Sequence, residues 1–215
     1  MSTVELSATD QLHLEQAAER LRREFDGMLN SETVERFLTD SADELAARAG
    51  LSMWIPLLAE RFAKDRLRAL TRLERPEFTT APSILFLCVH NAGRSQMAAG
   101  FARALGGAGV DVYSAGSEPA SEINAAAVAA MSELDIDIRQ QIPQPWSDEI
   151  VRAADVVVTM GCGDACPVFP GKRYVDWELD DPAGKPVEEV RQIRDDIRRR
   201  VERLLDELGV DLGRT

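Results

Sequence analysis

The chain falls into two stretches with different hydrophobic periodicity. Through about residue 78, apolar residues recur at intervals of three and four, which predicts amphipathic helices. Asp10, Ser31 and Ser52 mark the starts of three such segments, with Asp10 as the N-cap of the first. Pro56 falls in the first turn of the third, a position where proline is favoured. Three amphipathic helices with short connections predict an antiparallel three-helix bundle.

A linker is expected where the helical periodicity ends. Residues 75–82 read RPEFTTAP, and two prolines with two threonines after a helix are typical of a connection between domains. We therefore expect an all-α domain at residues 1–78 and a second domain at residues 79–215.

The second stretch alternates short apolar runs with helical segments. This alternation predicts an α/β fold with a doubly wound, four-stranded parallel sheet, whose ligands bind outside the carboxyl ends of the strands. Ser121 is expected to cap a helix that continues to Leu134. The strands are expected at residues 83–87, 110–116, 155–160 and 172–177, and the flanking helices begin at 95 and 186.

Charge and composition exclude several classes of function. The formal net charge of −12 argues against binding to nucleic acid or to an anionic membrane. No apolar run approaches the length of a membrane span, and the N-terminus lacks the basic and apolar regions of a secretory signal. Three cysteines among 215 residues suit a reducing compartment, so we expect a cytoplasmic protein.

The sequence CVHNAGR, residues 88–94, joins the first predicted strand to the helix that follows it. Successive N–H groups of such a loop can curl into a nest for a tetrahedral oxyanion, and the start of a helix favours negative charge. Gly93 can adopt positive φ at low cost, and Asn91 tolerates positive φ better than most residues. The residues expected to bind the oxyanion are Val89, His90, Asn91, Ala92, Gly93, Arg94 and Ser95.

Cys88 and Arg94 are the candidate reactive residues of this loop. The field of the loop favours the thiolate of Cys88, which is the nucleophilic form, and the Ser95 hydroxyl can donate a hydrogen bond to that sulfur. The guanidinium of Arg94 can bind two anion oxygens at once. The alternative is that Cys88 is a small buried hydrophobic residue, as a lone cysteine after an apolar run usually is. The neighbouring strand, helix and glycine favour the catalytic interpretation.

Two further cysteines, Cys162 and Cys166, follow the third predicted strand and should lie at the same sheet edge as Cys88. They could form a redox pair, could be inert, or could bind zinc. The zinc site would need more soft ligands, and His90 is the sole candidate, so no metal is expected. The redox pair is the preferred interpretation. In the acidic turn that follows, a carboxylic acid facing an anion can donate a proton to a leaving oxygen.

The motif Cys88-x-x-Asn91-x-x-Arg94-Ser95, the strand end Ser114-Ala-Gly116, and Asp181-Pro182 resemble the low-molecular-weight tyrosine phosphatase superfamily. Within it, CVHNAGRSQMA, the cysteines after VVVTM, and DDPAGK are most similar to the thioredoxin-coupled arsenate reductases. The resemblance covers about residues 82–210, and the preceding helical domain is similar to bundles attached to some actinobacterial-type members.

The resemblance implies a chemistry for each reactive residue. Cys88 would attack the arsenic of arsenate, and Asp181 would protonate the departing hydroxide. Cys162 would attack the Cys88 sulfur, which releases arsenite, and Cys166 would then form a disulfide with Cys162 that thioredoxin reduces. Phosphate and sulfate would compete as oxyanions. No tightly bound cofactor is implied, because thioredoxin supplies the reducing equivalents.

The sequence departs from the wider family at His90 and Gly93, where many phosphatases carry Gly and Cys. Cys162 and Cys166 are also closer together than in plasmid-type reductases. Three alternatives remain open: a tyrosine phosphatase, a one-thiol reductase resolved by a small thiol such as mycothiol, and a non-catalytic oxyanion sensor. Ala183 and Gly184 stand where phosphatases usually carry an aromatic residue, which makes the phosphatase the weaker alternative.

Overall fold

The computed structural model describes residues 7–48, 55–161 and 168–213. Contacts within the chain divide it into two compact units, Met1–Thr80 and Ala81–Thr215. No helix among these described residues is long and apolar enough to cross a bilayer.

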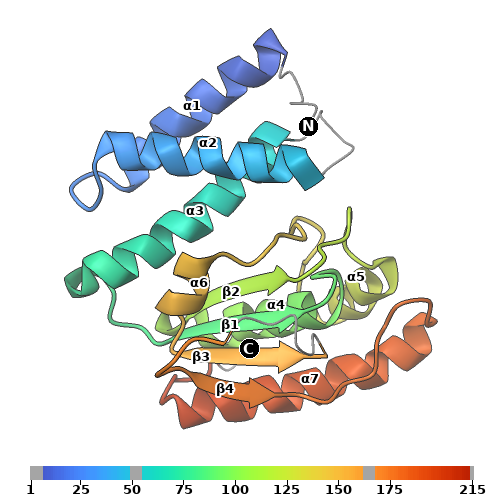
Figure 1. Cartoon of the computed structure of the whole chain (residues 1–215). Helices are drawn as coiled ribbons and strands as arrows, with labels where there is room; N and C mark the ends of the chain where they lie inside the picture. The colour runs from blue at the N-terminus through green and yellow to red at the C-terminus, as the bar shows by residue number, and fades with distance from the viewer. Residues whose placement is uncertain (1–6, 49–54, 162–167, 214–215) are drawn as a thin grey trace. The chain divides into compact units, whose positions relative to one another are not determined.

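The first unit is built from three helices that pack against one another: α1 (Ala8–Glu24), α2 (Ser31–Arg48) and α3 (Ile55–Glu74) (Figure 1). Pro56 lies in the first turn of α3, as predicted. The prediction that Asp10 caps α1 is wrong. Ser7 is the N-cap, and its hydroxyl accepts from the Asp10 N–H at 3.2 Å while the Asp10 carboxylate accepts from the Ser7 N–H at 3.1 Å. This reciprocal capping box satisfies two donors at the helix start.

The second unit contains a four-stranded parallel sheet with the strand order β2-β1-β3-β4 (Figure 1). The predicted fold class, with three helices before a four-stranded parallel sheet, is confirmed. The strands are β1 (Ser83–Cys88), β2 (Asp111–Gly116), β3 (Val156–Met160) and β4 (Arg173–Asp176). The helices are α4 (Arg94–Gly106), α5 (Ala125–Ser132), α6 (Asp148–Ala153) and α7 (Val187–Glu207), and 3₁₀ turns occur at Pro76–Phe78 and Gly107–Gly109.

The central strand β1 is buried along its whole length, which explains its unbroken apolar run. Ile84, Phe86 and Cys88 belong to a core cluster that also contains the inward faces of α4, α5 and α7. In register, Cys88 pairs with Gly116 of β2 on one side and with Met160 of β3 on the other. The chain leaves β1 toward β2 and later returns to its other edge as β3, so Cys88 lies where ligands bind in doubly wound sheets.

The helix predicted from Ser121 is shorter than expected and has a different cap. α5 begins at Ala125, and the Asn124 side chain accepts from the Ala127 N–H at 2.9 Å. Residues 117–124 instead pair their backbone with the loop that follows β1. The short helix α6 has no counterpart in the sequence-based prediction.

Candidate active site

The loop of residues 89–93 connects the carboxyl end of β1 to α4. Cys88 is the last residue of β1 and Arg94 is the first residue of α4, and both are buried. The strand therefore positions the sulfur, and the helix positions the guanidinium.

The backbone of the loop is oriented by the segment that follows β2. The Cys88 carbonyl and three loop carbonyls accept hydrogen bonds from this segment: Cys88 from the Ser117 N–H at 3.2 Å, Val89 from Glu118 at 2.8 Å, His90 from Ala120 at 2.9 Å, and Ala92 from Asn124 at 2.9 Å. No hydrogen bond in the described part of the chain uses the N–H groups of His90, Ala92, Gly93 or Arg94. Their carbonyls are engaged and these donors are available, which is the arrangement of an anion-binding nest.

Asn91 provides the left-handed residue that this loop requires. Its φ is +47°, whereas Gly93 has φ −129°, a value that any residue adopts. Of the two loop residues that could take positive φ, the loop therefore uses Asn91. The Asn91 side chain is fully buried, and its Oδ1 accepts from the Gln144 N–H at 2.9 Å and from Gln96 Nε2 at 3.0 Å.

The same asparagine orients the Cys88 sulfur through Ser95. Asn91 Nδ2 donates to Ser95 Oγ at 2.9 Å, and Ser95 Oγ lies 2.9 Å from Cys88 Sγ. Because one Ser95 lone pair is occupied by the amide, the hydroxyl hydrogen is free to point at the sulfur. The Asn91 N–H donates to the same sulfur at 3.2 Å. Two groups that can donate hydrogen bonds thus lie within 3.2 Å of Cys88 Sγ and fix its surroundings.

Arg94 and Asp181 form an ion pair at the site, with Nη2 of Arg94 2.9 Å from Oδ2 of Asp181. The other carboxylate oxygen accepts from the Ala183 N–H at 2.9 Å, so the turn orients it. The neighbouring Asp180 is paired elsewhere: the Lys185 ammonium lies 2.7 Å away and holds the pKa of the Asp180 carboxyl below its ordinary value. Of the two adjacent carboxylates, Asp181 is therefore the one that faces the site.

Three glycines allow close approaches around the loop. A Cβ atom on Gly93 would lie 2.5 Å from Cγ of Pro182, and one on Gly161 would lie 2.9 Å from Nη1 of Arg94. A Cβ on Gly116 would lie 2.6 Å from the Val89 carbonyl oxygen. Gly93 is thus required for contact with the Asp181 turn.

These residues enclose a pocket of about 40 Å³. It is lined by Cys88, His90, Ala92, Gly93, Arg94, Asn124, Asp181, Pro182 and Ala183. Of the other residues predicted to bind the oxyanion, Asn91 and Ser95 support the sulfur from behind the loop, while Val89 contributes its carbonyl to the pairing with Glu118. Cys162 and Cys166 lie outside the described residues.

Sequence reasoning missed Gln96, Gln144 and Asn124. Gln96 is fully buried one residue after Ser95, and its Nε2 also donates to the Ile142 carbonyl at 3.2 Å. A glutamine among the inward-facing positions of a helix start was the available signal for it. Gln144 reaches the loop through its backbone, which a sequence pattern does not reveal. Asn124 was hidden because Ser121 offered a competing cap.

Comparison with known proteins places this arrangement in a family. Residues 83–213 match the family described as low molecular weight phosphotyrosine protein phosphatase. The chain belongs to this family. The superfamily resemblance inferred from the loop motif is thereby confirmed. Residues 14–71 match a separate description, the protein-tyrosine-phosphatase-like N-terminal domain, which falls within the three-helix unit.

Relatives within the phosphatase family include named reductases. An arsenate reductase of Staphylococcus aureus is 40% identical over 125 residues, which are 56% of this chain and 94% of that protein. Arsenate reductase 2 of Staphylococcus saprophyticus is 41% identical over 128 residues, 58% of this chain and 96% of that protein.

Solved structures of the family also resemble this chain. A thioredoxin-dependent arsenate reductase of Corynebacterium glutamicum is 40% identical, with a TM-score of 0.78 that covers 91% of this chain and 96% of the other. An arsenate reductase in its phosphate-binding state is 34% identical with a TM-score of 0.53, covering 59% of this chain and 98% of that one. The first likeness therefore extends over both units.

Proposed function

We propose that this protein reduces arsenate to arsenite, with Cys88 as the nucleophile and thioredoxin as the final reductant. The proposal is carried by the Cys88 sulfur, which receives two hydrogen bonds inside a loop of free N–H donors and faces an Arg94–Asp181 pair. The likeness to named arsenate reductases along almost their whole length supports arsenate as the substrate. The Corynebacterium reductase named as thioredoxin-dependent supports the choice of reductant.

In the first step the oxyanion takes the place of Asp181 on the Arg94 guanidinium. The thiolate of Cys88 attacks arsenic, an As–S bond forms, and an As–O bond breaks. Asp181 delivers a solvent proton to the leaving hydroxide, which departs as water. Arsenic is still pentavalent at this stage.

The electrons are transferred in the second step. The Cys162 thiolate attacks Cys88 Sγ, the S–As bond breaks, and its electron pair stays on arsenic, so trivalent arsenite leaves. The resulting Cys88–Cys162 disulfide is attacked by Cys166, which frees Cys88 and leaves a Cys162–Cys166 disulfide. Two electrons from thioredoxin restore both thiols, which balances the two electrons that arsenic gained.

The proposal is tested by following NADPH oxidation with arsenate, thioredoxin and thioredoxin reductase. Cys88→Ser, Cys162→Ser and Cys166→Ser are each expected to lower turnover to the background rate. Turnover that survives in both Cys162→Ser and Cys166→Ser when a small thiol such as mycothiol is supplied would replace the three-thiol relay with a one-thiol route. Tight oxyanion binding without turnover on any reductant would instead indicate a sensor.

A phosphatase is the second candidate, because the matched family is a phosphatase family and Cys88, Arg94 and Asp181 would suffice for phosphoryl transfer. The pocket wall beyond Asp181 is formed by Pro182 and Ala183, and none of the described residues that line the pocket is Phe, Tyr or Trp. Hydrolysis of a small aryl phosphate with kcat/KM above that for arsenate reduction would favour this candidate.

A further inference from the structure

Asn124 lines the pocket but lies outside the loop of residues 89–93, which we call the anion loop. It lines the pocket together with Cys88, Arg94 and Asp181, and its N–H donates to the Ala92 carbonyl at 2.9 Å. This hydrogen bond fixes the position of Asn124 next to an anion that is bound by the loop.

The side-chain amide of Asn124 has a defined orientation. Its Oδ1 accepts from the Ala127 N–H at 2.9 Å and so caps α5. Because the oxygen is the acceptor of that bond, Nδ2 is left as the donor end of the amide. No hydrogen bond in the described part of the chain uses Nδ2, and the side chain is half-buried at the pocket wall.

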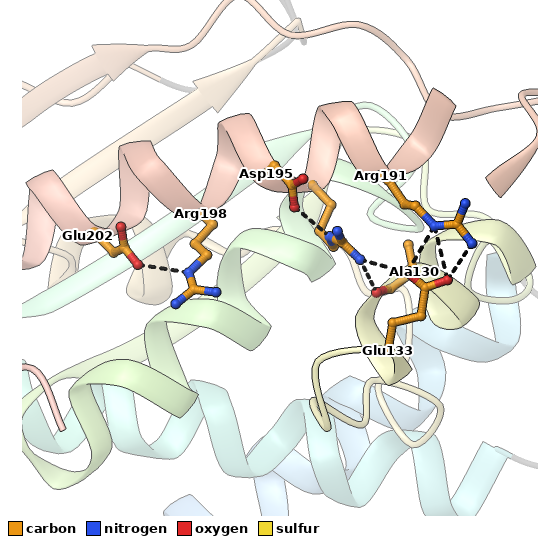
Figure 2. A network of polar contacts seen from close by, with 7 residues as sticks. Ala130, Glu133, Arg191, Asp195, Arg198 and Glu202 are labelled. Carbon is orange, nitrogen blue, oxygen red and sulfur yellow. Dashed lines mark hydrogen bonds and ion pairs between the residues drawn. The ribbon is translucent and has the colours of Figure 1, made fainter. Parts of the chain in front are cut away.

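The opposite end of α5 is bound to α7. Nη1 of the buried Arg194 donates to the Ala130 carbonyl at 2.8 Å and to Glu133 at 3.0 Å, and Arg191 binds the same Glu133 carboxylate at 2.7 Å (Figure 2). α5 is therefore held at its C-terminal end by two arginines and at its N-terminal end by the anion loop. This restrains Asn124 from moving away from the pocket.

We propose that Asn124 is a further oxyanion-binding residue, whose Nδ2 donates a hydrogen bond to an oxygen that Arg94 leaves free. The inference rests on the proposed function, because the ligand is the same tetrahedral oxyanion. It adds a neutral donor to a site otherwise built from backbone N–H groups and one guanidinium. The helix cap and the ligand contact use opposite ends of one amide.

The test is phosphate binding to the full chain, measured by isothermal titration calorimetry, with Asn124→Ser. Serine caps helices about as well as asparagine, but its side chain ends at the oxygen that caps Ala127 and has no amide nitrogen to extend to the position of Nδ2. The Kd for phosphate is expected to rise about tenfold, the effect of one hydrogen bond to a charged group, without a change in Tm. The KM for arsenate should rise by a similar factor, with a smaller change in kcat.

The matched control is Asn30→Ser. Asn30 Oδ1 accepts from the Thr33 N–H at 2.8 Å, so it makes the same type of cap at the start of α2, in the three-helix unit. This variant should bind phosphate as the wild type does. Wild-type affinity in Asn124→Ser, or a loss of affinity accompanied by a lower Tm than in Asn30→Ser, would mean that Asn124 is a helix cap alone. Failure of the wild type to bind phosphate would overturn the proposed function itself.

Discussion

At the scale of single residues, a short chain of hydrogen bonds leads to the Cys88 sulfur. Gln96 Nε2 donates to Asn91 Oδ1 at 3.0 Å, and Asn91 Nδ2 donates to Ser95 Oγ at 2.9 Å. Ser95 Oγ in turn lies 2.9 Å from Cys88 Sγ. Since buried donors and acceptors in such a chain orient one another, the sulfur meets a donor whose direction is set before any ligand arrives.

Ser95→Ala removes the donor nearest the sulfur. A hydrogen bond to a charged group contributes about 1.5–3 kcal/mol, so kcat/KM for arsenate is expected to fall about 10- to 100-fold. Alkylation of Cys88 by iodoacetamide at neutral pH should slow in parallel, and mass spectrometry of the modified peptide measures it. An alkylation rate equal to that of the wild type would show that Ser95 does not stabilise the thiolate.

Ser147→Ala is the matched control for that substitution. The Ser147 hydroxyl is buried, and it has no hydrogen-bond partner in the part of the chain that the structure describes. Removing a buried hydroxyl that makes no bond is close to neutral or stabilising. Turnover should therefore be unchanged in Ser147→Ala, with a Tm equal to or above that of the wild type.

Cys88, Arg94 and Asp181 could be singled out from the sequence because such residue types are typical of anion chemistry at a strand–helix junction, and the structure brings the three together. The backbone geometry was less accessible. Gly93 and Asn91 were both able to take positive φ, and the structure uses Asn91 at φ +47°, whereas Gly93 is needed for its approach to Pro182. A pattern of residues within one segment does not reveal contacts with a turn nearly ninety residues later.

At the scale of elements, α5 is held between the anion loop and α7. The boundaries of long elements such as α7 were predicted within a residue or two, because their apolar spacing is sustained over several turns. The start of α5 was misplaced because residues 117–124 bond to the loop carbonyls instead of continuing a helix. Long-range pairing thus determines where this helix begins.

Arg194→Met tests the connection between α5 and α7. Arg194 is buried and donates to the Ala130 carbonyl, to Glu133 and to Asp195, so its loss leaves a buried carbonyl unpaired. We expect the free energy of unfolding to fall by about 2 kcal/mol, measured by urea denaturation followed by circular dichroism. A loss no larger than that of the control would contradict this role.

The control is Arg198→Met on the same helix (Figure 2). Arg198 is exposed and pairs with Glu202 one turn away at 2.8 Å. Exposed pairs of this spacing contribute about 0.5 kcal/mol or less. The difference between the two variants therefore isolates the contribution of the buried arginine.

The contact of Glu133 with Arg191 and Arg194 predicts that the stability of the protein depends on pH. The hydrogen bond from Arg191, followed by that from Arg194, lowers the pKa of Glu133 below its ordinary value of 4.5. A carboxyl with a depressed pKa in the folded state stabilises the protein above its unfolded pKa, and this stability is lost as pH falls through the folded pKa. Glu133→Gln should thus be less stable than the wild type at pH 7. The difference in free energy of unfolding between Glu133→Gln and the wild type should become smaller as pH falls below 4.5.

At the scale of the whole molecule, every described contact of the site lies within the second unit, Ala81–Thr215. The division into two units could be predicted from the sequence, because apolar residues follow helical spacing before the linker and alternate between strand and helix patterns after it. The sequence of the first unit does not indicate how this unit contributes to function. Its described buried residues are mostly the apolar ones that form the core of a helical unit.

The fragment of residues 81–215 is expected to fold and to reduce arsenate with the kcat/KM of the full chain. The Staphylococcus aureus relative supports this, because the matched 125 residues make up 94% of it. Circular dichroism and the NADPH-coupled assay measure the two properties. A folded fragment without turnover would assign the three-helix unit a direct part in catalysis.

The pairing of residues 117–124 with the loop carbonyls has a consequence for discrimination among substrates. Those bonds form as the chain folds, so the N–H groups of the loop are already in position before an oxyanion arrives. Binding of the oxyanion therefore needs no rearrangement of the loop backbone. Under the proposed function, a preformed shell of this kind is expected to accept phosphate and sulfate as well as arsenate, because all three are tetrahedral ions of similar radius. Under the proposed function, preference for arsenate then arises after capture, from the readiness of arsenic to take up two electrons, a step that phosphorus and sulfur at this centre do not undergo.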